Sequence, residues 1–469
     1  FRQLVDAPGF AVVGHIGVAD VARAQNRFED AVAAYRAASA VAPLPAAAVL
    51  ALATSLCQLG RNTEALAVYD EYLARAVQDD PLHRARADLL MLMGRLPQAA
   101  LAWRAELDRD PDDATARSRM ATLAEHLGQL DAARTQADVV LLTRPDDAEM
   151  HLIRIRSLLR TGADEQARAA LDALSTLPLT EGQRRLGSNY LGHVRDRAGE
   201  VFAAVPCFVD AQYGTPAALP PLEEPHAELR AVLAEPMAQE WALAPTLLLG
   251  MPGSGVEQVA ALLADQPRLV VLRDRANGVL RDDDFNHPRF AHYCGELAEA
   301  DREALRERYL APLRQAGIAL DRPIIDWLPR WDAHLLALIR RAMPGTRLII
   351  VERDPRDALL NWLGFGWLPG FACPAPVVAA DWLVRARHHL AFASELAEPS
   401  RLTVVADALL AGDEHASAQL ARFLAVDGLR RGGQFAASAH GHAGLPARFA
   451  AGHWQAYEEA LGEAFNRLQ

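Results

Sequence analysis

The chain has 469 residues, of which 51% are hydrophobic, so it is long enough for about three domains and apolar enough for a large core. The formal net charge is −12 and there is no basic tail, which argues against nucleic acid as the main partner. The longest apolar runs are too short to cross a bilayer, so the sequence predicts no membrane span.

The basic and thiol residues narrow the possible chemistry. All 48 basic residues are arginine, and this excludes a mechanism that needs a lysine ammonium at the reacting centre. The cysteines are far apart and fit no zinc or redox spacing, and no other metal-binding motif occurs. We therefore expect no metal, and free thiols in a reducing compartment, the cytoplasm. The cysteines are Cys57, Cys207, Cys294 and Cys373.

A pattern recurs through the first two hundred residues. A turn-forming residue, usually glycine, ends one apolar segment, and an alanine follows five residues later. The first five turn positions are 34 residues apart, and the last interval is 37. The turn positions are Asn26, Gly60, Gly94, Gly128, Gly162 and Gly199, and the alanines are Ala31, Ala65, Ala99, Ala133, Ala167 and Ala204.

Aromatic side chains often follow the alanines by four residues, as at Tyr35, Tyr69, Trp103 and Phe208. A period of this length with small residues at fixed offsets resembles the tetratricopeptide repeat. The resemblance implies about six helix–turn–helix units over residues 1–212, stacked as a superhelix that binds a peptide or protein partner on its concave face. An irregular helical bundle is the alternative. The oligomeric state is not encoded in any pattern that we recognise.

A proline-rich stretch, residues 213–245, separates this array from a different pattern over residues 246–469. Apolar runs of strand type now alternate with amphipathic helical segments, which predicts a parallel sheet covered by helices. The expected strands are Leu247–Leu249, Leu269–Leu272, Ile324–Ile325, Leu348–Val351 and Leu402–Val405. Ligands of such sheets bind beyond the carboxyl ends of the strands.

The first chemical signal is the loop that follows Leu247–Leu249. Its glycines let backbone N–H groups converge on an anion, and the next helix adds its positive end. The spacing from Gly250 to Gly255 is that of a nucleoside-triphosphate loop, but Val256 and Glu257 replace the Lys and Ser/Thr that such a loop needs. The sequence therefore argues against a magnesium-dependent NTPase. An ordinary strand–turn–helix is the alternative.

The second signal follows the strand Leu348–Val351. Arg353 stands at the strand end, Pro355 suits the first turn of a helix, and Asn361 lies eight residues beyond Arg353. An arginine in this position offers a second anion site. The alternative is a helix-capping cluster in which Arg353 pairs with Asp357.

These two stretches resemble the sulfotransferases that carry tetratricopeptide repeats. In that family the loop reads Gly-Met-Pro-Arg-Ser-Gly-Thr-Thr, and an arginine with a serine eight residues later binds a phosphate. The resemblance implies a P-loop-like α/β domain that binds 3′-phosphoadenosine 5′-phosphosulfate and transfers sulfate to a hydroxyl. The implied cofactor-binding residues are Gly250, Gly253, Ser254, Gly255, Val256, Glu257, Arg353 and Asn361.

Further residues carry the likeness or depart from it. Asp326 and Pro329 match the family's Asp-Lys-x-Pro-x-Asn, and Trp454 with Tyr457 matches its Gly-Arg-Trp-x-x-Tyr. Other residues depart from the family pattern. In order, they replace the basic residue of the loop, the two threonines of the loop, and the lysine and asparagine of Asp-Lys-x-Pro-x-Asn. They are Gly253, Val256, Glu257, Trp327 and Trp331.

Sulfuryl transfer also needs a cation for the developing charge and a base for the acceptor. Arg273 and Arg275 follow the second expected strand and are candidates for the cation, and Asp274 is the candidate base. The alternative for Asp274 is a solvated carboxylate paired with its neighbours. Glu257, which would repel a phosphate, could simply be stabilised by the helix dipole.

Three functions remain open from the sequence. They are an active sulfotransferase, a catalytically impaired pseudo-enzyme kept as a binding module, and a plain repeat scaffold without nucleotide affinity. The aromatic cluster Trp362, Phe365 and Trp367 is expected to pack in the core, with stacking on an adenine as the alternative. His388 and His389 are expected to be a surface or packing pair.

Overall fold

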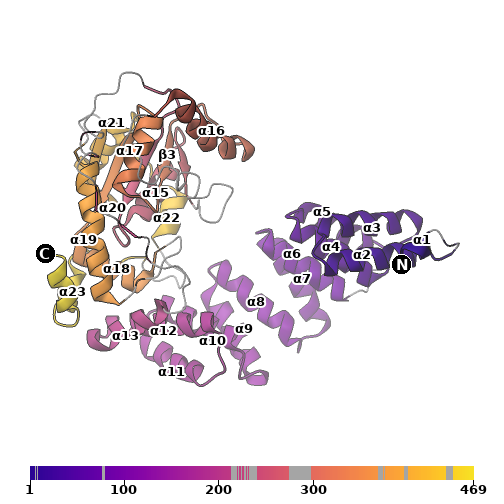
Figure 1. Cartoon of the computed structure of the whole chain (residues 1–469). Coiled ribbons are helices and arrows are strands. Elements are labelled where there is room, and N and C mark those ends of the chain that lie inside the picture. The colour runs from indigo at the N-terminus through magenta and orange to yellow at the C-terminus, as the bar shows by residue number, and fades with distance from the viewer. Residues whose placement is uncertain are drawn as a thin grey trace. The chain divides into compact units, whose positions relative to one another are not determined.

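A computed structural model describes the chain except for residues 6, 8, 76–79, 213–218, 220, 223, 226–228, 230, 232–239, 274–296, 368–372, 374, 396–399 and 440–446. The chain divides into two compact units, Phe1–Ser157 and Leu158–Gln469. Figure 1 shows helices throughout the first unit, and helices followed by a sheet in the second. Among the described residues no helix is long and apolar enough to cross a membrane.

The first unit consists of successive antiparallel helix pairs. The turn position of each pair adopts a left-handed backbone, with φ of 57° at Asn26 and 70° at Gly94. The alanine five residues later has no exposed surface at Ala31, Ala65, Ala99 or Ala133, so neighbouring helices approach closely there. The helices are α1 (Arg2–Val5), α2 (Ala11–Ala24), α3 (Phe28–Val41), α4 (Ala46–Gln58), α5 (Asn62–Leu73), α6 (Asp80–Leu92), α7 (Leu96–Arg109), α8 (Ala114–His126), α9 (Leu130–Thr143) and α10 (Ala148–Arg160).

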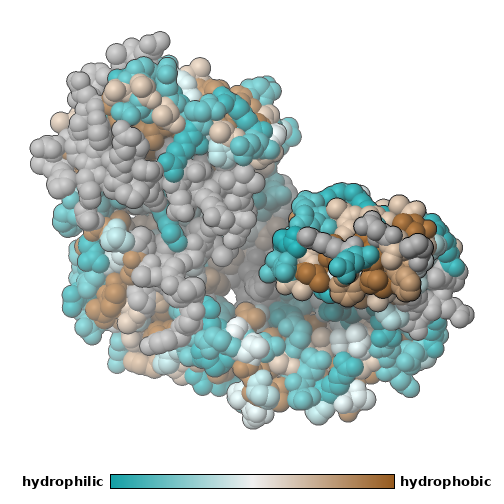
Figure 2. Space-filling model, turned by 45° about the vertical axis from the view of Figure 1, so that its right-hand side comes forward, coloured by the Kyte–Doolittle hydropathy of each residue, from teal (hydrophilic) through white to brown (hydrophobic). Residues whose placement is uncertain are grey.

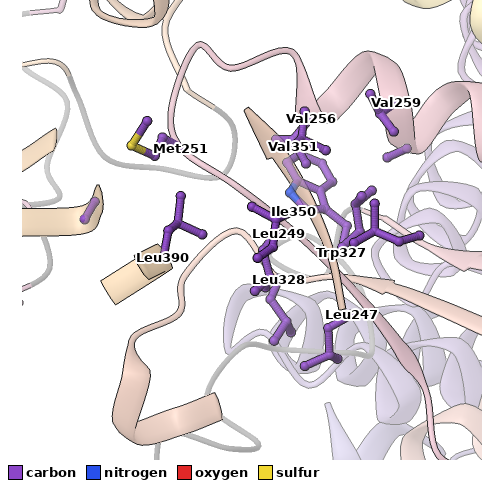
Figure 3. Close-up of a cluster of buried hydrophobic side chains, with 14 of the residues drawn as sticks. Leu247, Leu249, Met251, Val256, Val259, Trp327, Leu328, Ile350, Val351 and Leu390 are labelled. Carbon is purple, nitrogen blue, oxygen red and sulfur yellow. The ribbon is translucent and has the colours of Figure 1, made fainter. Parts of the chain in front are cut away.

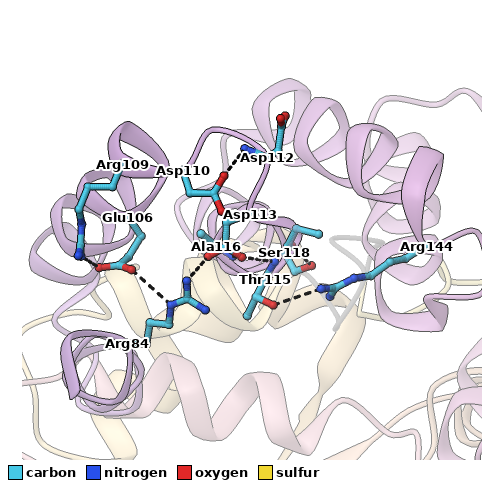
Figure 4. Close-up of polar contacts among 11 residues, drawn as sticks. Arg84, Glu106, Arg109, Asp110, Asp112, Asp113, Thr115, Ala116, Ser118 and Arg144 are labelled. Carbon is cyan, nitrogen blue, oxygen red and sulfur yellow. Dashed lines mark hydrogen bonds and ion pairs between the residues drawn. The ribbon is translucent and has the colours of Figure 1, made fainter. Parts of the chain in front are cut away.

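Charged side chains join successive repeats in this unit (Figure 4). Arg84 of α6 donates to Glu106 of α7 at 3.3 Å and to Asp113, the N-cap of α8, at 2.5 Å. Arg156 of α10 makes a bidentate pair with Glu125 of α8, with distances of 2.6 and 2.8 Å. The Arg84–Asp113 and Arg156–Glu125 contacts span 29 and 31 residues of sequence, close to one repeat, whereas the Arg84–Glu106 contact spans 22 residues and lies within one helix pair.

The second unit begins with helices of the same type and continues into a parallel sheet. The helices are α11 (Asp164–Ser175), α12 (Glu181–Arg197) and α13 (Val201–Gln212). The strands are β1 (Thr246–Gly250), β2 (Val270–Leu272), β3 (Ile324–Trp327), β4 (Arg347–Glu352) and β5 (Arg401–Val405). They pair in the order β2-β3-β1-β4-β5, and every described pair is parallel.

The strand order sets the layers around the sheet. The step from β1 to β2 runs in one direction along the sheet, and the later steps run in the other. Right-handed crossovers therefore put α15 (Val256–Ala264) on one face, and the helices that follow β2, β3 and β4 on the opposite face. The latter are α16 (Glu299–Gln315), α17 (Ala333–Ala342), α18 (Pro355–Phe365) and α19 (Pro376–Ala393).

The remaining helices complete the cover of the sheet. Among the helices, α15 contacts α20 and α22, whereas α19 contacts α17, α18 and α23. These helices are α20 (Ala406–Ala411), α21 (Glu414–Phe423), α22 (Gly433–Ser438), the 3-10 helix η2 (His453–Tyr457) and α23 (Gly462–Arg467).

The core of the second unit lies around the central strands (Figure 3). Every residue of β1 is buried, and Leu248 and Leu249 have no exposed surface. Continuous apolar strands are typical of parallel sheets that are covered on both faces. The predicted core positions Trp362 and Trp367 are 0% and 6% exposed, which confirms the packing interpretation for both.

The described surface mixes polar and apolar residues, and teal and brown are interspersed over the face in Figure 2. Single large apolar side chains are exposed, such as Leu142 at 83% and Leu101 at 73%. Isolated exposures of this kind are ordinary for a folded protein.

Candidate functional site

The loop between β1 and α15 requires glycine at three positions. Gly253 and Gly255 have φ of 73° and 87°, a backbone region that side chains disfavour. A Cβ on Gly250 would lie 2.6 Å from Ser254 Oγ, so the loop closes tightly over its own start. Val256 is fully buried and begins α15, and Glu257 lies in its first turn.

The loop packs directly against α18. A Cβ on Gly253 would lie 2.0 Å from the carbonyl oxygen of Ala358 and 2.8 Å from the amide nitrogen of Trp362. No side chain, and therefore no basic residue, fits at this position without movement of the backbone. The glycine that replaces the family's basic residue is thus a packing requirement of this fold.

Ser254 is completely buried beneath the loop. Its amide donates to Met251 O at 3.0 Å, while its Oγ has no hydrogen-bond partner among the described residues. A buried hydroxyl without a partner is uncommon in folded proteins. Ser254 Oγ is therefore free to form a hydrogen bond next to the backbone of Gly250.

Asn361 joins this loop to the C-terminal segment. Its Nδ2 donates to Gly253 O at 3.1 Å, and its Oδ1 accepts from the amide of Phe449 at 2.8 Å. Both polar atoms of the side chain are therefore engaged inside the protein. The expected position of Asn361, two turns into the helix after β4, is confirmed.

Arg353 lies where β4 ends, and its side chain is fully buried. Its Nε pairs with Asp407 of α20 at 2.9 Å, and its Nη2 donates to Phe449 O at 2.8 Å. The third nitrogen, Nη1, has no partner among the described residues. Arg448 pairs with the same carboxylate of Asp407. Arg353 thus pairs with Asp407 and not with Asp357, the partner considered from the sequence.

The two signals meet at one edge of the sheet. β1 and β4 are adjacent, and their following segments lead to strands on opposite sides. This is a topological switch point, where open α/β sheets bind ligands. Arg353 and Asn361 both bind the backbone of Phe449, so the structure brings together the Gly253 loop, Arg353 and Asn361.

The residues expected to carry catalysis are placed only in part. Arg273 follows β2 and donates to Gln434 of α22 at 2.6 Å. Asp274 and Arg275 lie outside the described residues. Among the residues that are described, no group of three or more His, Cys, Asp or Glu side chains is arranged to hold a metal.

Sequence reasoning missed the side chains that cover the end of α18. Asn189 and His193 of α12 bond to Gly364 O at 2.8 and 3.1 Å, and Gln212 of α13 donates to Leu363 O at 3.1 Å. Helix carbonyls at a C-terminus need such partners. Burial lowers the pKa of His193 to about 4, so the ring is neutral at pH 7. No feature of a single sequence pairs these positions.

A second polar cluster surrounds η2. Asp196 of α12 accepts from Tyr457 OH at 2.8 Å and lies 2.7 Å from His453 Nε2. The bond to Asp196 raises the pKa of His453. Asp357 accepts from the amides of Gly452 and Trp454 at 2.7 and 3.1 Å. The segment that resembles the family's Gly-Arg-Trp-x-x-Tyr therefore fastens the C-terminal segment to α12 and α18.

The histidines and the Asp326 segment have structural roles. His389 is buried, and its Nδ1 accepts from the amide of Ala333 at 3.0 Å, whereas His388 is exposed. Trp331 donates to Gly250 O at 3.3 Å, and the rings of Trp327 and Trp367 meet edge to face at 5.9 Å. Trp331 thus packs beside the loop, and Trp327 packs against Trp367.

Comparison with known proteins identifies the repeats. The tetratricopeptide repeat family model matches residues 19–81, 84–141 and 119–177. No curated protein is significantly similar to the chain.

Solved repeat structures resemble part of the chain. A tetratricopeptide repeat protein from Parabacteroides merdae is 16% identical, with a TM-score of 0.37, over 45% of this chain and 81% of its own. MamA from Desulfovibrio magneticus RS-1 is 15% identical, with a TM-score of 0.34, over 36% of this chain and 97% of its own. YrrB, a protein with an unusual peptide-binding site, is 18% identical, with a TM-score of 0.33, over 37% of this chain and 89% of its own. The family model identifies residues 19–81 and 84–177 of this chain as tetratricopeptide repeats.

Proposed function

We propose that this chain is a protein-binding scaffold, with repeats that hold a peptide or protein partner and a sulfotransferase-like C-terminal domain that is impaired in sulfuryl transfer. The observation that carries the impairment is the Arg353–Asp407 ion pair of 2.9 Å, in which the expected phosphate ligand already has an anion. A carboxylate that already neutralises a buried arginine competes with an external phosphate for the same guanidinium, which weakens phosphate binding.

Gly253 supports the same conclusion. The residue that would neutralise developing charge in the family is replaced by a glycine whose Cβ position is 2.0 Å from Ala358 O. Glu257 adds a carboxylate at the start of α15, where a phosphosulfate would otherwise meet only amides. The loop between β1 and α15 therefore keeps the glycine-rich backbone of the family but lacks the family's basic side chain.

Calorimetry on the full chain tests this function. We expect no heat of binding with adenosine 3′,5′-bisphosphate, and no transfer from radiolabelled donor to phenols or sugars. Asp407→Asn removes the internal anion, so that variant should bind the bisphosphate at least tenfold more tightly than wild type. Labelled product formed by the wild-type chain would sink the proposal.

An active sulfotransferase that uses 3′-phosphoadenosine 5′-phosphosulfate is the second candidate. It is favoured by the switch point between β1 and β4 and by two uncommitted buried atoms, Ser254 Oγ and Arg353 Nη1. A bound nucleotide would supply acceptors for both. Tight binding by wild type that is lost in Arg353→Ala would favour this candidate.

The partner of the repeats is proposed to be a peptide or a protein segment. A cavity of about 720 Å³ opens between α3, α4 and α5, where Leu44 and Leu52 form an apolar floor beside Tyr72. Such a combination suits an extended peptide with an apolar side chain. The concave face expected from the repeat period stays a prediction.

Selection of a peptide library on the full chain tests the partner. We expect enriched peptides whose affinity falls at least tenfold in Tyr72→Ala. Leu101→Ala, at an exposed position outside this cavity, should leave the affinity unchanged. Enriched peptides that bind both variants equally well would place the site elsewhere.

A cytoplasmic location is proposed from the thiols. Cys57, Cys207 and Cys373 are free, and burial raises the pKa of Cys373, which keeps its thiol protonated. Thiols without a disulfide partner suit a reducing compartment. Cell fractionation with a tagged chain checks this location.

A further inference from the structure

A second pocket lies on the other side of the β1 loop from Arg353. It has a volume of about 260 Å³ and lies beyond the carboxyl ends of β1 and β3, whereas Arg353 follows β4. The backbone of Gly250 to Pro252 forms one wall. The other walls include Arg330, Trp331, Asp332, Leu335 and Trp382.

Arg330 is the unusual member of this wall. It is partly buried, its Nε is buried, and among the described residues its guanidinium has no hydrogen-bond or ion-pair partner. Other arginines at the same sheet edge are paired, such as Arg353 with Asp407 and Arg356 with Asp354. A partly desolvated cation without a counterion is unfavourable, and a bound anion would relieve it.

The carboxylate of the pocket does not supply that anion. Asp332 is the N-cap of α17, and its Oδ1 accepts from the amide of Leu335 at 2.7 Å. A carboxylate in this position is stabilised by the helix terminus. Asp332 is thus held at the helix terminus and forms no ion pair with Arg330 among the described residues, which leaves the Arg330 guanidinium unpaired.

The rest of the wall is apolar and aromatic. Trp382 is 7% exposed and Leu335 is 9% exposed, and Trp331 is fixed by its bond to Gly250 O. A cavity of roughly 150 Å³ holds a benzene molecule in another protein, so 260 Å³ has room for one ring with an acidic substituent. Large apolar walls with one placed charge are typical of small-molecule sites.

We propose that this pocket binds a single-ring aromatic oxyanion, with the acidic group on the Arg330 guanidinium and the ring against Trp331, Trp382 and Leu335. The acidic group is a carboxylate or a sulfate ester, since both present oxygens to a guanidinium. The site does not depend on nucleotide binding, because it lies on the β3 side of β1.

Calorimetry of the full chain with benzoate, phenyl sulfate and the neutral analogue benzamide tests the site. At least one anion should bind with a Kd below about 1 mM and at least tenfold more tightly than benzamide, because it forms a charged bond that benzamide cannot form. Comparison of the affinities of benzoate and phenyl sulfate shows whether the pocket prefers a carboxylate or a sulfate ester. In the Asp407→Asn variant, which is expected to bind adenosine 3′,5′-bisphosphate, saturation with that nucleotide should not weaken binding of the anions, which separates this test from that of the β1/β4 site.

Three variants locate the site. Arg330→Gln should lose the preference for the anion over benzamide, whereas Arg356→Gln, a paired arginine outside the pocket, should retain it. Leu335→Phe fills the cavity and should weaken all three ligands. Absence of heat with both anions, or equal affinities in wild type and Arg330→Gln, overturns the proposal.

Discussion

The repeat region and the sheet domain differ in how their side chains find partners. In Phe1–Ser157 the contacts repeat along the chain, and each links a helix to its neighbour in the same or the next repeat, as Arg156 links to Glu125. In Leu158–Gln469 the decisive contacts join distant segments, such as Asn361 with Gly253 and Phe449. The repeat period of the sequence therefore predicts the helix contacts of the first region well. In the second region the sequence motifs predict where residues lie on the strands and helices, but not which side chains they contact.

The largest expected effect tests whether ion pairs between repeats stabilise the first region. Arg156 and Glu125 have side chains only 11% and 9% exposed. Arg156→Ala should lower the free energy of unfolding by about 3–5 kcal/mol, since it removes the bidentate partner of a buried carboxylate. Urea unfolding followed by circular dichroism measures this change.

Two controls accompany that variant. Arg27→Ala removes a pair whose side chains are 49% and 61% exposed, so its effect should stay below about 1 kcal/mol. The double variant Arg156→Leu with Glu125→Leu should recover most of the loss, because no buried charge remains. A loss as small as that of Arg27→Ala would contradict the role of this pair.

Glycine substitution compares the two regions directly. Gly253→Ala should destabilise the chain by about 2–4 kcal/mol, from a left-handed backbone and from contact with Ala358 O. Gly94→Ala has a similar φ, but its Cβ would meet nothing within 4 Å, so about 1 kcal/mol is expected. Equal losses in thermal unfolding would show that the loop moves freely away from α18.

The pH dependence of stability distinguishes two histidines of the second region. Since burial lowers the pKa of His193 to about 4, its contribution is present above the unfolded pKa of about 6.5 and is lost as the pH falls towards 4. Between pH 7 and pH 5 the loss is about 2 kcal/mol. His193→Gln should flatten this slope in thermal melts.

His453 should act with the opposite sign. Its pKa is raised by the bond to Asp196, so its contribution is present below the unfolded pKa and is lost as the pH rises through the folded pKa. His453→Gln should therefore steepen the loss of stability in acid. A pH profile that is unchanged in both variants would remove this assignment.

The smallest effect concerns a helix of repeat type in the second unit. Thr180 and Gln183 form a capping box at the start of α12. Thr180→Ala should cost about 1 kcal/mol, as caps do in general. A Gln183→Glu variant keeps the box and serves as the control in the same unfolding experiment.

Much of the fold could be predicted because its causes are local. The left-handed turns at Asn26, Gly60 and Gly94 follow from residue type and spacing, and the buried alanines follow from the same period. The apolar runs likewise predicted the parallel sheet, and Arg353 stands at a strand end as expected.

The partners at the candidate site could not be predicted in the same way. Nothing near Arg353 in the sequence points to Asp407, which lies 54 residues away, or to the backbone of Phe449, 96 residues away. Arg330 was not singled out either, because its lack of a partner exists only in three dimensions. Side-chain pairing across a fold depends on tertiary geometry, which one sequence does not display.

The covering of α18 by Asn189, His193 and Gln212 has a consequence for how this chain can be divided. A fragment that starts at Thr246 would leave carbonyls without donors and would strip His193 and Phe208 from the rings of Phe365 and Phe449. We expect such a fragment to aggregate on expression, and one that starts before Thr180 to stay monodisperse. The last helical hairpin and the sheet therefore form one structural module, and a cut between them exposes surface that each covers on the other.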